Sequence, residues 1–382
     1  MTSWPNVKLG DVMRLDLDRV TVDASVTYPM VGVYSFGRGL FHREPVEGGN
    51  TSYKQFYRLK ADHIVMSQLF GWEGALALSS EEFEGRFVSP QFPTFRCDEE
   101  KLDRHFLGWL MRRPLFWQDL GTRASGMGDR RRTLSPDSLF AAHIPLPPLP
   151  EQRRIVARIE SLAAQIHEVR TLREQAHKEV QFLVTSIHLH LAGSRRKRLG
   201  QFLKLDEEQV PVTPAEDYRQ VGVKGFGGGL FSKPAVTGAD TTYSIFNRLY
   251  EGALVLSQVK GWEGAVAVSG SDLAGWYVSP EYRTFRCISS EARPAYLSAV
   301  VRTEWFWSRL KDATRGVGAR RERTRPEQFL EIEVPMPTVE KQAQAEVVFA
   351  RMGALKNLQA ETAAELDALL PSILDKAFKG EL

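Results

Sequence analysis

The sequence predicts two α/β (α+β) globular modules that are copies of one another, joined by two long helices forming an antiparallel coiled coil with internal pseudo-twofold symmetry. Two observations support this fold class. The chain of 382 residues repeats itself from end to end at an offset of about 190 residues, and each copy ends in a long helical pattern. A repeat this long can enclose its own hydrophobic core, unlike the short repeats of a solenoid. The predicted domains are a first module at 1–148, a first spacer helix at 149–194, a second module at 195–337 and a second spacer helix at 338–382.

The repeat is clearest at two landmarks. The segment 31–41 returns at 221–231, and the sequence Gly-Trp-Glu-Gly-Ala at 71–75 returns at 261–265. No insertion is needed between the landmarks. Apolar runs near them, such as 64–66, are broken by Gly and Pro and therefore predict short strands joined by turns.

Helices and a proline-rich strand complete each copy. The segments 106–120 and 296–310 have helical patterns, and Pro114 must interrupt the first of them. Proline-punctuated strands at 144–150 and 334–337 then lead into the long helices.

The first long helix is predicted from apolar residues spaced by three or four, with Arg and Glu between them and no Gly until Gly193. These apolar residues are Ile155, Ile159, Leu162, Ile166, Val169, Leu172, Ala176, Val180, Leu183 and Ile187. The second copy repeats the pattern less strictly, and Pro371 is expected to kink its last turns. Some 40 residues of helix span roughly 60 Å, more than a globular domain requires. Such a narrow apolar strip needs a partner, and the simplest partner for each helix is the other, with the modules at opposite ends of a rod.

Composition restricts the class of protein. The 50 Lys and Arg residues against 47 Asp and Glu leave a net charge of only +3, so a nucleic-acid partner must be argued from where basic residues cluster. The two cysteines, Cys97 and Cys287, occupy equivalent positions in the two copies, which favours free buried thiols over a disulfide or a metal site. No apolar run reaches membrane-spanning length and no signal-peptide core is present, so a soluble cytoplasmic protein without a membrane partner is expected.

Two segments carry a family resemblance that extends over essentially the whole chain. They are the Pro-Leu-Pro-Pro-Leu-Pro-Glu-Gln stretch within 144–155, and the ending Phe378-Lys379-Gly380-Glu381-Leu382. Together with the duplication, they resemble the specificity (S) subunit of type I restriction-modification systems.

The resemblance implies a DNA-recognition subunit in phage defence that has no catalytic residues and holds no cofactor or metal itself. Each module would be a target recognition domain that reads one half of a split site on double-stranded DNA. The paired helices would set the gap between the halves and dock methyltransferase (M) subunits, probably two, which bind S-adenosylmethionine and methylate adenine. A separate restriction or motor (R) subunit would cut the DNA.

The residues themselves argue against catalysis by this chain alone. All eight histidines lie in the first copy, which excludes a duplicated active site based on histidine. The glycine-rich segments 36–41 and 226–231 lack the Lys-Ser/Thr of a nucleotide-binding loop and are better explained as tight turns. Glu73 and Glu263 recur without a second carboxylate at useful spacing, so each is expected to form a cap or an ion pair within the fold.

The candidate DNA-binding residues fall into two groups. Loops rich in Gly and Arg at 122–132 and 312–322 recur at the same offset and suit contact with phosphates or guanine edges, although a solvated loop is the alternative. Other residues differ between the copies on a shared framework, as base-reading residues should, and Trp72 and Trp262 either hold their loops or stack on bases. The candidates are Tyr34, Arg38, Gln68, Phe70, Trp72, Arg123, Arg130, Arg131, Arg132, Lys224, Gln258, Lys260, Trp262, Arg315, Arg320, Arg321 and Arg323.

Two other classes of function stay open at this stage. The chain could be a stand-alone enzyme that modifies or cleaves DNA, or a scaffold whose modules bind other proteins. Within the resembled family, a modification-only variant without the R subunit is also open.

Overall fold

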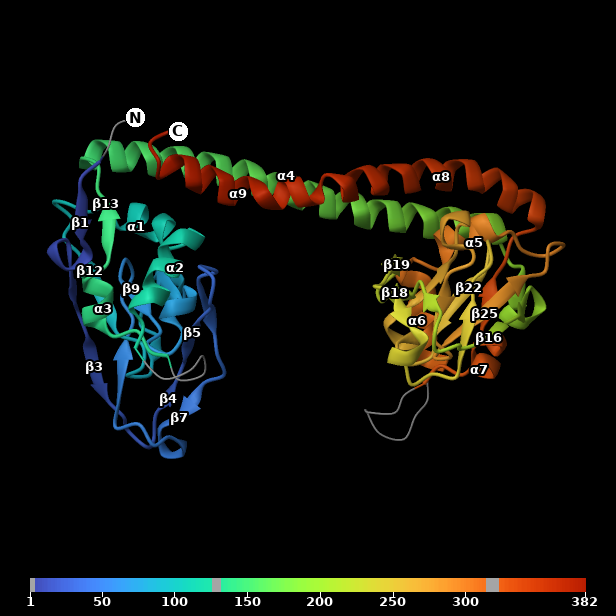
Figure 1. Cartoon of the computed structure of the whole chain (residues 1–382), viewed down its shortest axis with the longest axis horizontal. Helices are drawn as coiled ribbons and strands as arrows, with labels where there is room; N and C mark the ends of the chain where they lie inside the picture. Colours follow the sequence, from blue (N-terminus) through green and yellow to red (C-terminus); the bar gives the residue numbers. More distant parts are fainter. Residues whose placement is uncertain (1–3, 126–131, 314–322) are drawn as a thin grey trace. The chain divides into compact units, whose positions relative to one another are not determined.

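The computed structural model describes residues 4–125, 132–313 and 323–382 (Figure 1). The chain divides into two compact units. The first unit contains residues 1–169 and 363–382, and the second contains residues 170–362. Each unit therefore combines one module with parts of both long helices.

The module of the first unit is built from short antiparallel strands. In chain order these are β1 (Asn6–Lys8), β2 (Met13–Leu15), β3 (Asp18–Thr21), β4 (Thr27–Tyr28), β5 (Val31–Val33), β6 (Leu40–His42), β7 (Val46–Glu47), β8 (Gln55–Arg58), β9 (Ile64–Met66), β10 (Leu76–Leu78), β11 (Phe87–Val88), β12 (Thr94–Cys97) and β13 (His143–Pro145). They form a four-stranded sheet in the order β10-β9-β12-β2, a three-stranded sheet in the order β11-β8-β3, and the pairs β1-β13, β4-β7 and β5-β6.

The second module repeats this topology. Its strands are β14 (Arg196–Arg198), β15 (Leu203–Leu205), β16 (Glu208–Pro211), β17 (Asp217–Tyr218), β18 (Val221–Lys224), β19 (Gly229–Ser232), β20 (Val236–Thr237), β21 (Ile245–Arg248), β22 (Leu254–Ser257), β23 (Val266–Val268), β24 (Tyr277–Val278), β25 (Tyr282–Cys287) and β26 (Glu333–Pro335). The four-stranded sheet has the order β15-β25-β22-β23 and the three-stranded sheet the order β16-β21-β24. Strand for strand these are the orders of the first module, so the predicted duplication and fold class are confirmed.

The short helices agree with the sequence in the first module and differ in the second. The first module has α1 (Arg104–Leu110), α2 (Pro114–Arg123) and α3 (Pro136–Phe140). The helical pattern is interrupted before Pro114 as expected, and Pro114 becomes the first residue of α2. The second has α5 (Pro294–Val300), α6 (Glu304–Ala313) and α7 (Pro326–Glu331), so the continuous helix predicted at 296–310 was wrong. Thr303 causes the break without a proline, because its hydroxyl accepts a hydrogen bond from the amide of Phe306 at 3.3 Å and caps α6.

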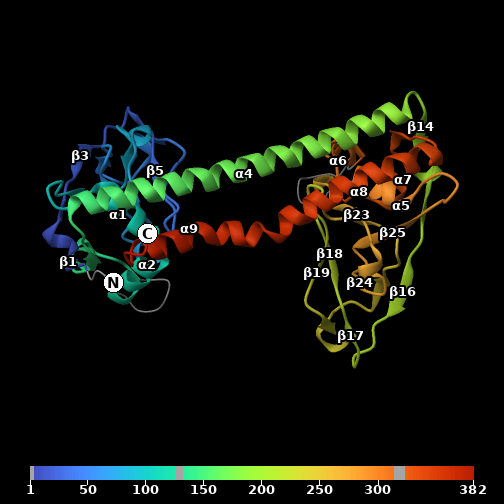
Figure 2. The same cartoon turned by 90° about the horizontal axis from the view of Figure 1, so that it is seen from above.

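The long helices are α4 (Leu149–Ala192), α8 (Val339–Glu361) and α9 (Ala363–Ala377). In the second unit α4 and α8 run antiparallel (Figures 1 and 2). Lys341, near the start of α8, donates to the carbonyl of Leu191 near the end of α4, whereas Arg173, further back along α4, donates to Thr362 just beyond α8. The predicted antiparallel pairing is therefore confirmed.

The helix continues through Pro371, where the sequence predicts a kink. Pro371 lies inside α9, and the interruption comes earlier, at Thr362. The Thr362 hydroxyl lies 3.2 Å from the carbonyl oxygen of Leu358 and 2.8 Å from a guanidinium nitrogen of Arg173. A threonine hydroxyl that bonds to a backbone carbonyl one turn earlier is a recognised cause of helix bending.

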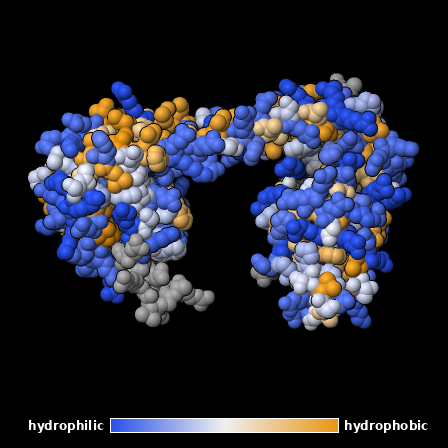
Figure 3. All heavy atoms as spheres, turned by 180° about the vertical axis from the view of Figure 1, so that it is seen from behind, coloured by the Kyte–Doolittle hydropathy of each residue, from blue (hydrophilic) through white to orange (hydrophobic). Residues whose placement is uncertain are grey.

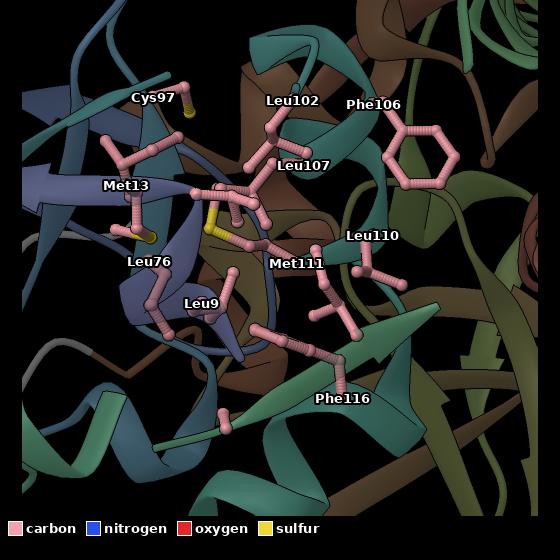
Figure 4. Close-up of a cluster of buried hydrophobic side chains, with 14 of the residues drawn as sticks. Leu9, Met13, Leu76, Cys97, Leu102, Phe106, Leu107, Leu110, Met111 and Phe116 are labelled. Carbon is pink, nitrogen blue, oxygen red and sulfur yellow. The ribbon is translucent and has the colours of Figure 1, made fainter. Parts of the chain in front are cut away.

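Each unit has a hydrophobic core that the helix ends help to close. In the first unit, Leu9, Met13 and Phe106 belong to a buried cluster (Figure 4) that also includes Leu374 and Phe378 from the chain end. In the second unit, the corresponding cluster takes Val184 from α4 and Phe349 from α8. Each core is thus completed by helix segments from both halves of the sequence.

A buried glutamine at the start of each long helix explains the Glu-Gln of the sequence motif. Gln152 is fully buried; its Nε2 donates to the carbonyls of Lys101 and Pro147 at 2.8 Å, and its Oε1 accepts from the Asp103 amide at 2.8 Å. Gln342 makes the same three bonds in the second unit, to Glu291, Pro337 and Arg293. The repeat therefore continues without insertion into the helices.

Replacing this glutamine should destabilise the first unit. Gln152→Leu would leave two carbonyls and one amide without their buried partner, so we expect the free energy of unfolding to fall by about 3 kcal/mol. Urea denaturation followed by circular dichroism measures this. Gln165→Leu, an exposed glutamine on the same helix, is the matched control and should change stability little. Equal losses in the two variants would contradict the role of Gln152.

Hydrophilic and apolar residues are interspersed on the visible face of each unit (Figure 3). Across the described residues, the longest apolar helical stretches fall short of what a membrane crossing needs. Cys97 is a buried free thiol, as predicted, whereas Cys287 is free but only half-buried. Desolvation raises their pKa values to about 12 and about 11.

Candidate nucleic-acid interface

A loop containing the repeated tryptophan connects two central strands in each module. We call residues 67–75, and their equivalents 257–265, the tryptophan loops. The first lies between β9 and β10, and the Ser67 amide donates to the Ala75 carbonyl at 2.9 Å to close its base. The Ser67 hydroxyl accepts from the amide of Phe70 at 3.2 Å, and in the second loop the Ser257 hydroxyl accepts from the amide of Lys260 at the same distance. Phe70 and Lys260 are therefore presented by the same backbone.

One glycine in each tryptophan loop is required by both its conformation and its surroundings. Gly74 and Gly264 have φ of 82° and 73°, in the left-handed region. A Cβ atom on Gly74 would lie 2.7 Å from the ring of Trp117, and one on Gly264 would lie 2.5 Å from Trp307. The absence of a side chain thus lets a tryptophan of α2 or α6 pack directly on the loop.

The glycine-rich segments are the tight turns that the sequence predicts. Residues 34–39 connect β5 and β6 and form the first glycine turn; residues 225–228 connect β18 and β19 and form the second. Phe36 and Phe226 have positive φ, which is strained for a bulky residue. The Phe36 amide donates to the carbonyl of Glu73 at 2.8 Å, and its ring meets that of Trp117 edge-on at 5.6 Å. Each glycine turn is therefore fixed against its tryptophan loop, since Phe226 makes the equivalent contacts.

In the second module an arginine also holds the glycine turn. The Arg302 side chain donates from Nε to the carbonyl of Gly227 at 2.9 Å, and burial lowers the pKa of its guanidinium. Sequence reasoning missed this residue and also Trp117 and Trp307. All three have equivalents at the repeat offset, so recurrence of the type that identified Trp72 was the available signal.

The residues predicted to read bases on or directly beside the glycine turns are exposed. Tyr34 is 42% exposed, and the Arg38 guanidinium lies 5.0 Å from its ring centroid. In the second module Lys224 is exposed, and its ammonium lies 5.4 Å from the ring of Phe231. Each module therefore presents a cation beside an aromatic ring at this place. The pair is Arg38 and Tyr34 in the first module, and Lys224 and Phe231 in the second.

On the tryptophan loops, Phe70 is 50% exposed, and the ammonium of Lys260 lies 3.8 Å from a carboxylate oxygen of Glu263. Gln68 and Gln258 are half-buried, and their carbonyls accept from Leu134 and Thr324 at 2.8 and 2.9 Å. These two bonds join each tryptophan loop to the chain just beyond the Arg-rich segment.

Trp72 and Trp262 are half-buried. The indole nitrogen of Trp72 donates to the carbonyl of Leu69 at 2.9 Å, and the Arg132 guanidinium lies 5.4 Å from its ring. Phe36, Trp72, Trp117 and Arg132 line an open recess of about 450 Å³. Trp72 thus stiffens its loop and also keeps a face at the surface.

The predicted arginines differ in their surroundings. Arg123 forms an ion pair with Asp119 at 2.9 Å and donates to the carbonyl of Ala141. Its guanidinium therefore already has partners within the first module. Arg323 pairs with Glu281 at 3.2 Å. Arg130, Arg131, Arg315, Arg320 and Arg321 lie outside the described residues.

Glu73 and Glu263 make contacts within the fold, as predicted. Glu73 accepts a hydrogen bond from the Ser35 hydroxyl at 3.3 Å, and Glu263 is the partner of Lys260. Within the described ranges, His, Cys, Asp and Glu side chains nowhere gather in the numbers that a metal ion requires. The arrangement offers exposed aromatic rings and cations on a rigid scaffold, which suits contact with base edges and phosphates.

No protein-family model matches the chain, and no curated protein sequence matches it. Solved structures do. The HsdS subunit from Thermoanaerobacter tengcongensis matches with a TM-score of 0.51 and 23% identity, over 100% of this chain and 98% of that one. A chain from a structure concerned with complex assembly and conformational transition of the type I R-M (restriction-modification) system matches with a TM-score of 0.66 and 23% identity, over 100% and 99%. Over its full length, this chain has the fold of these type I restriction-modification proteins, in agreement with the resemblance seen in its sequence.

Proposed function

We propose that this chain is the DNA-specificity subunit of a type I restriction-modification complex and that it is not itself an enzyme. Each module would read one half of a bipartite site on double-stranded DNA. The observation that carries the proposal is that the same rigid pair of loops recurs in both units, with different exposed residues at matching positions, such as Phe70 and Lys260. A protein that reads two related but different half-sites needs this combination of constant scaffold and variable tip.

The long helices have a separate role in this proposal. Helix α4 has 44 residues, which corresponds to about 66 Å at 1.5 Å per residue. Such a helix would set the gap between the half-sites and dock M subunits, probably two, that carry S-adenosylmethionine in the cytoplasm. An R subunit would add cleavage where the system has one.

The first test separates recognition from catalysis. The purified chain with S-adenosylmethionine and DNA should methylate nothing, because the methyl donor binds the M subunit in this proposal. Adding the M subunit should give adenine methylation at one bipartite motif, which methylome sequencing of the host with and without this gene would identify. Methylation or metal-dependent cleavage by the isolated chain would instead support a stand-alone enzyme.

A second test separates DNA binding from protein binding. We expect affinity for duplex DNA to fall by at least tenfold between about 50 and 200 mM salt, because several cation–phosphate contacts release counterions. Fluorescence anisotropy at a series of salt concentrations measures this. A scaffold that binds proteins through the exposed rings of Phe36 and Phe70 would show little salt dependence and no DNA affinity.

A further inference from the structure

In each unit, the module packs against the end of the long helix that belongs to the other half of the sequence. The first module packs on Leu374 and Phe378 at the end of the chain. The second module packs on Val184 and on the neighbouring His188, at the end of α4. The two junctions are equivalent under the repeat, since Gln152 and Gln342 show that the offset continues into the helices.

The junction in the first unit combines an aromatic pair with an ion pair. Phe106 is fully buried and meets the ring of Phe378 edge-on, at a centroid distance of 5.1 Å. Arg113, whose side chain is only 13% exposed, forms an ion pair with Asp375. The aromatic contact is apolar on both sides, and the ion pair gives a nearly buried cation a carboxylate partner.

The equivalent positions in the second unit have different chemistry. Tyr296 stands in the place of Phe106 and His188 in the place of Phe378; both are buried, and the tyrosine hydroxyl lies 2.6 Å from Nδ1 of His188. Thr303 replaces Arg113 and Thr185 replaces Asp375. Both threonine hydroxyls bond to backbone carbonyls of their own segments, Val300 and Gln181. The second junction thus has a polar histidine–tyrosine pair where the first has two phenylalanines. It has neutral threonines where the first has an ion pair.

The N-terminal half of the chain carries the first module and α4, and the C-terminal half carries the second module, α8 and α9. These differences matter in a pair of two N-terminal halves, where the first module would meet the end of α4. Such a junction would place His188 against Phe106, so the buried imidazole would lose its hydroxyl partner. It would also place Arg113 beside Thr185, so the guanidinium would lose its carboxylate. Burying an unpaired polar or charged group is strongly unfavourable.

A pair of two C-terminal halves would suffer the complementary faults. The buried hydroxyl of Tyr296 would face Phe378. Asp375 would lie beside Thr303, where it loses its ion pair with Arg113 and keeps only the one with Lys379. We propose that these two sets of residues form a pairing code that makes each module accept the helix end of the other half and reject that of its own. The partner that the code excludes is a second copy of the same half.

This inference rests on the proposed function only for its biological meaning. Pairing unlike halves gives an assembly with two different modules, which would read an asymmetric bipartite site. Pairing like halves would give a symmetric reader and a palindromic site. The code itself is a property of folding and can be tested without DNA.

The test uses the full chain with a protease site inserted at Gly193, in the turn that follows α4. The folded protein is cleaved there, unfolded in urea, refolded by dilution and weighed by native mass spectrometry, which distinguishes pairs of unlike halves from pairs of like halves. The comparison is a variant with His188→Phe, Tyr296→Phe, Arg113→Thr and Asp375→Thr. Each substitution copies the residue that the chain already has at the equivalent junction, so the variant should fold.

We expect the cleaved parent to refold at least tenfold in favour of unlike pairs, and the variant to give a mixture that includes like pairs. His190→Phe, an exposed substitution on the same helix, should behave as the parent. Like pairs as abundant in the parent as in the variant would overturn the proposal, and so would a variant that still forms unlike pairs alone. Neither readout depends on whether the protein binds DNA.

Discussion

Lys260→Phe should convert the base preference of the second module towards that of the first. Lys260 and Phe70 stand on the same backbone, each with its amide bonded to a serine hydroxyl at 3.2 Å. A lysine at a base edge donates to guanine, whereas a phenylalanine contacts the methyl group of thymine. One good base contact corresponds to about 1–3 kcal/mol of discrimination. We therefore expect the ratio of affinities for guanine and thymine at one position to change by roughly 5- to 150-fold.

The measurement is competition binding by the M–S complex to duplexes that vary at each position of the second half-site. Phe70→Lys is the reciprocal variant and should shift the first half-site in the opposite direction. Lys204→Phe removes an exposed lysine on β15, outside the loop, and serves as the matched control. A uniform loss of affinity for all duplexes after Lys260→Phe would mean that Lys260 contacts phosphate and does not read bases.

The parts of the fold that could be predicted from sequence are those set by local rules. Glycine and proline punctuation identified β9, β10 and the turn at Phe36, and the spacing of apolar residues identified α4 almost to its last turn. Pro114 interrupts the helical pattern as predicted, because a proline in a helix interior removes a backbone hydrogen bond and clashes with the preceding turn.

The parts that could not be predicted depend on contacts between remote segments. The helix break at Thr303 has no proline. The interruption at Thr362 lies where its hydroxyl bonds to a backbone carbonyl and to Arg173. Trp117 packs on Gly74 only because α2 reaches the tryptophan loop, a fact that no local pattern contains. The pairing of Arg123 with Asp119 is the exception, since a spacing of four on a helix brings opposite charges together.

The same division applies to the candidate interface. Recurrence at a fixed offset drew attention to the tryptophan loops, and divergence within them singled out Phe70 and Lys260, which are exposed. It could not show that Phe36 holds the glycine turn against Trp117, or that Arg132 lies over Trp72. Residues that recur in both copies identify the shared scaffold, and residues that differ identify the variable positions on it. The contacts between these residues are visible only in the three-dimensional structure.

Acid should destabilise the second unit through His188. Burial, with a smaller contribution from the nearby charge of Arg309, lowers the pKa of this histidine from 6.5 to about 4. The unfolded chain takes up the proton near pH 6.5, whereas the folded protein does so only near pH 4. Stability is therefore fully present above about pH 6.5 and is lost progressively as the pH falls towards 4. A shift of this size corresponds to about 3 kcal/mol.

Thermal unfolding between pH 4 and pH 7 tests this expectation with two variants. His188→Phe combined with Tyr296→Phe copies the Phe106–Phe378 contact and removes the titrating group, so the unfolding temperature should lose the part of its pH dependence that lies between pH 4 and 6.5. His190→Phe removes an exposed histidine one turn or less away and controls for the substitution itself. Parallel pH profiles for the parent and the double variant would show that other groups carry the acid sensitivity. A steeper profile for the parent is the expected result, because protonation of His188 then weakens its buried contact with Tyr296 in acid.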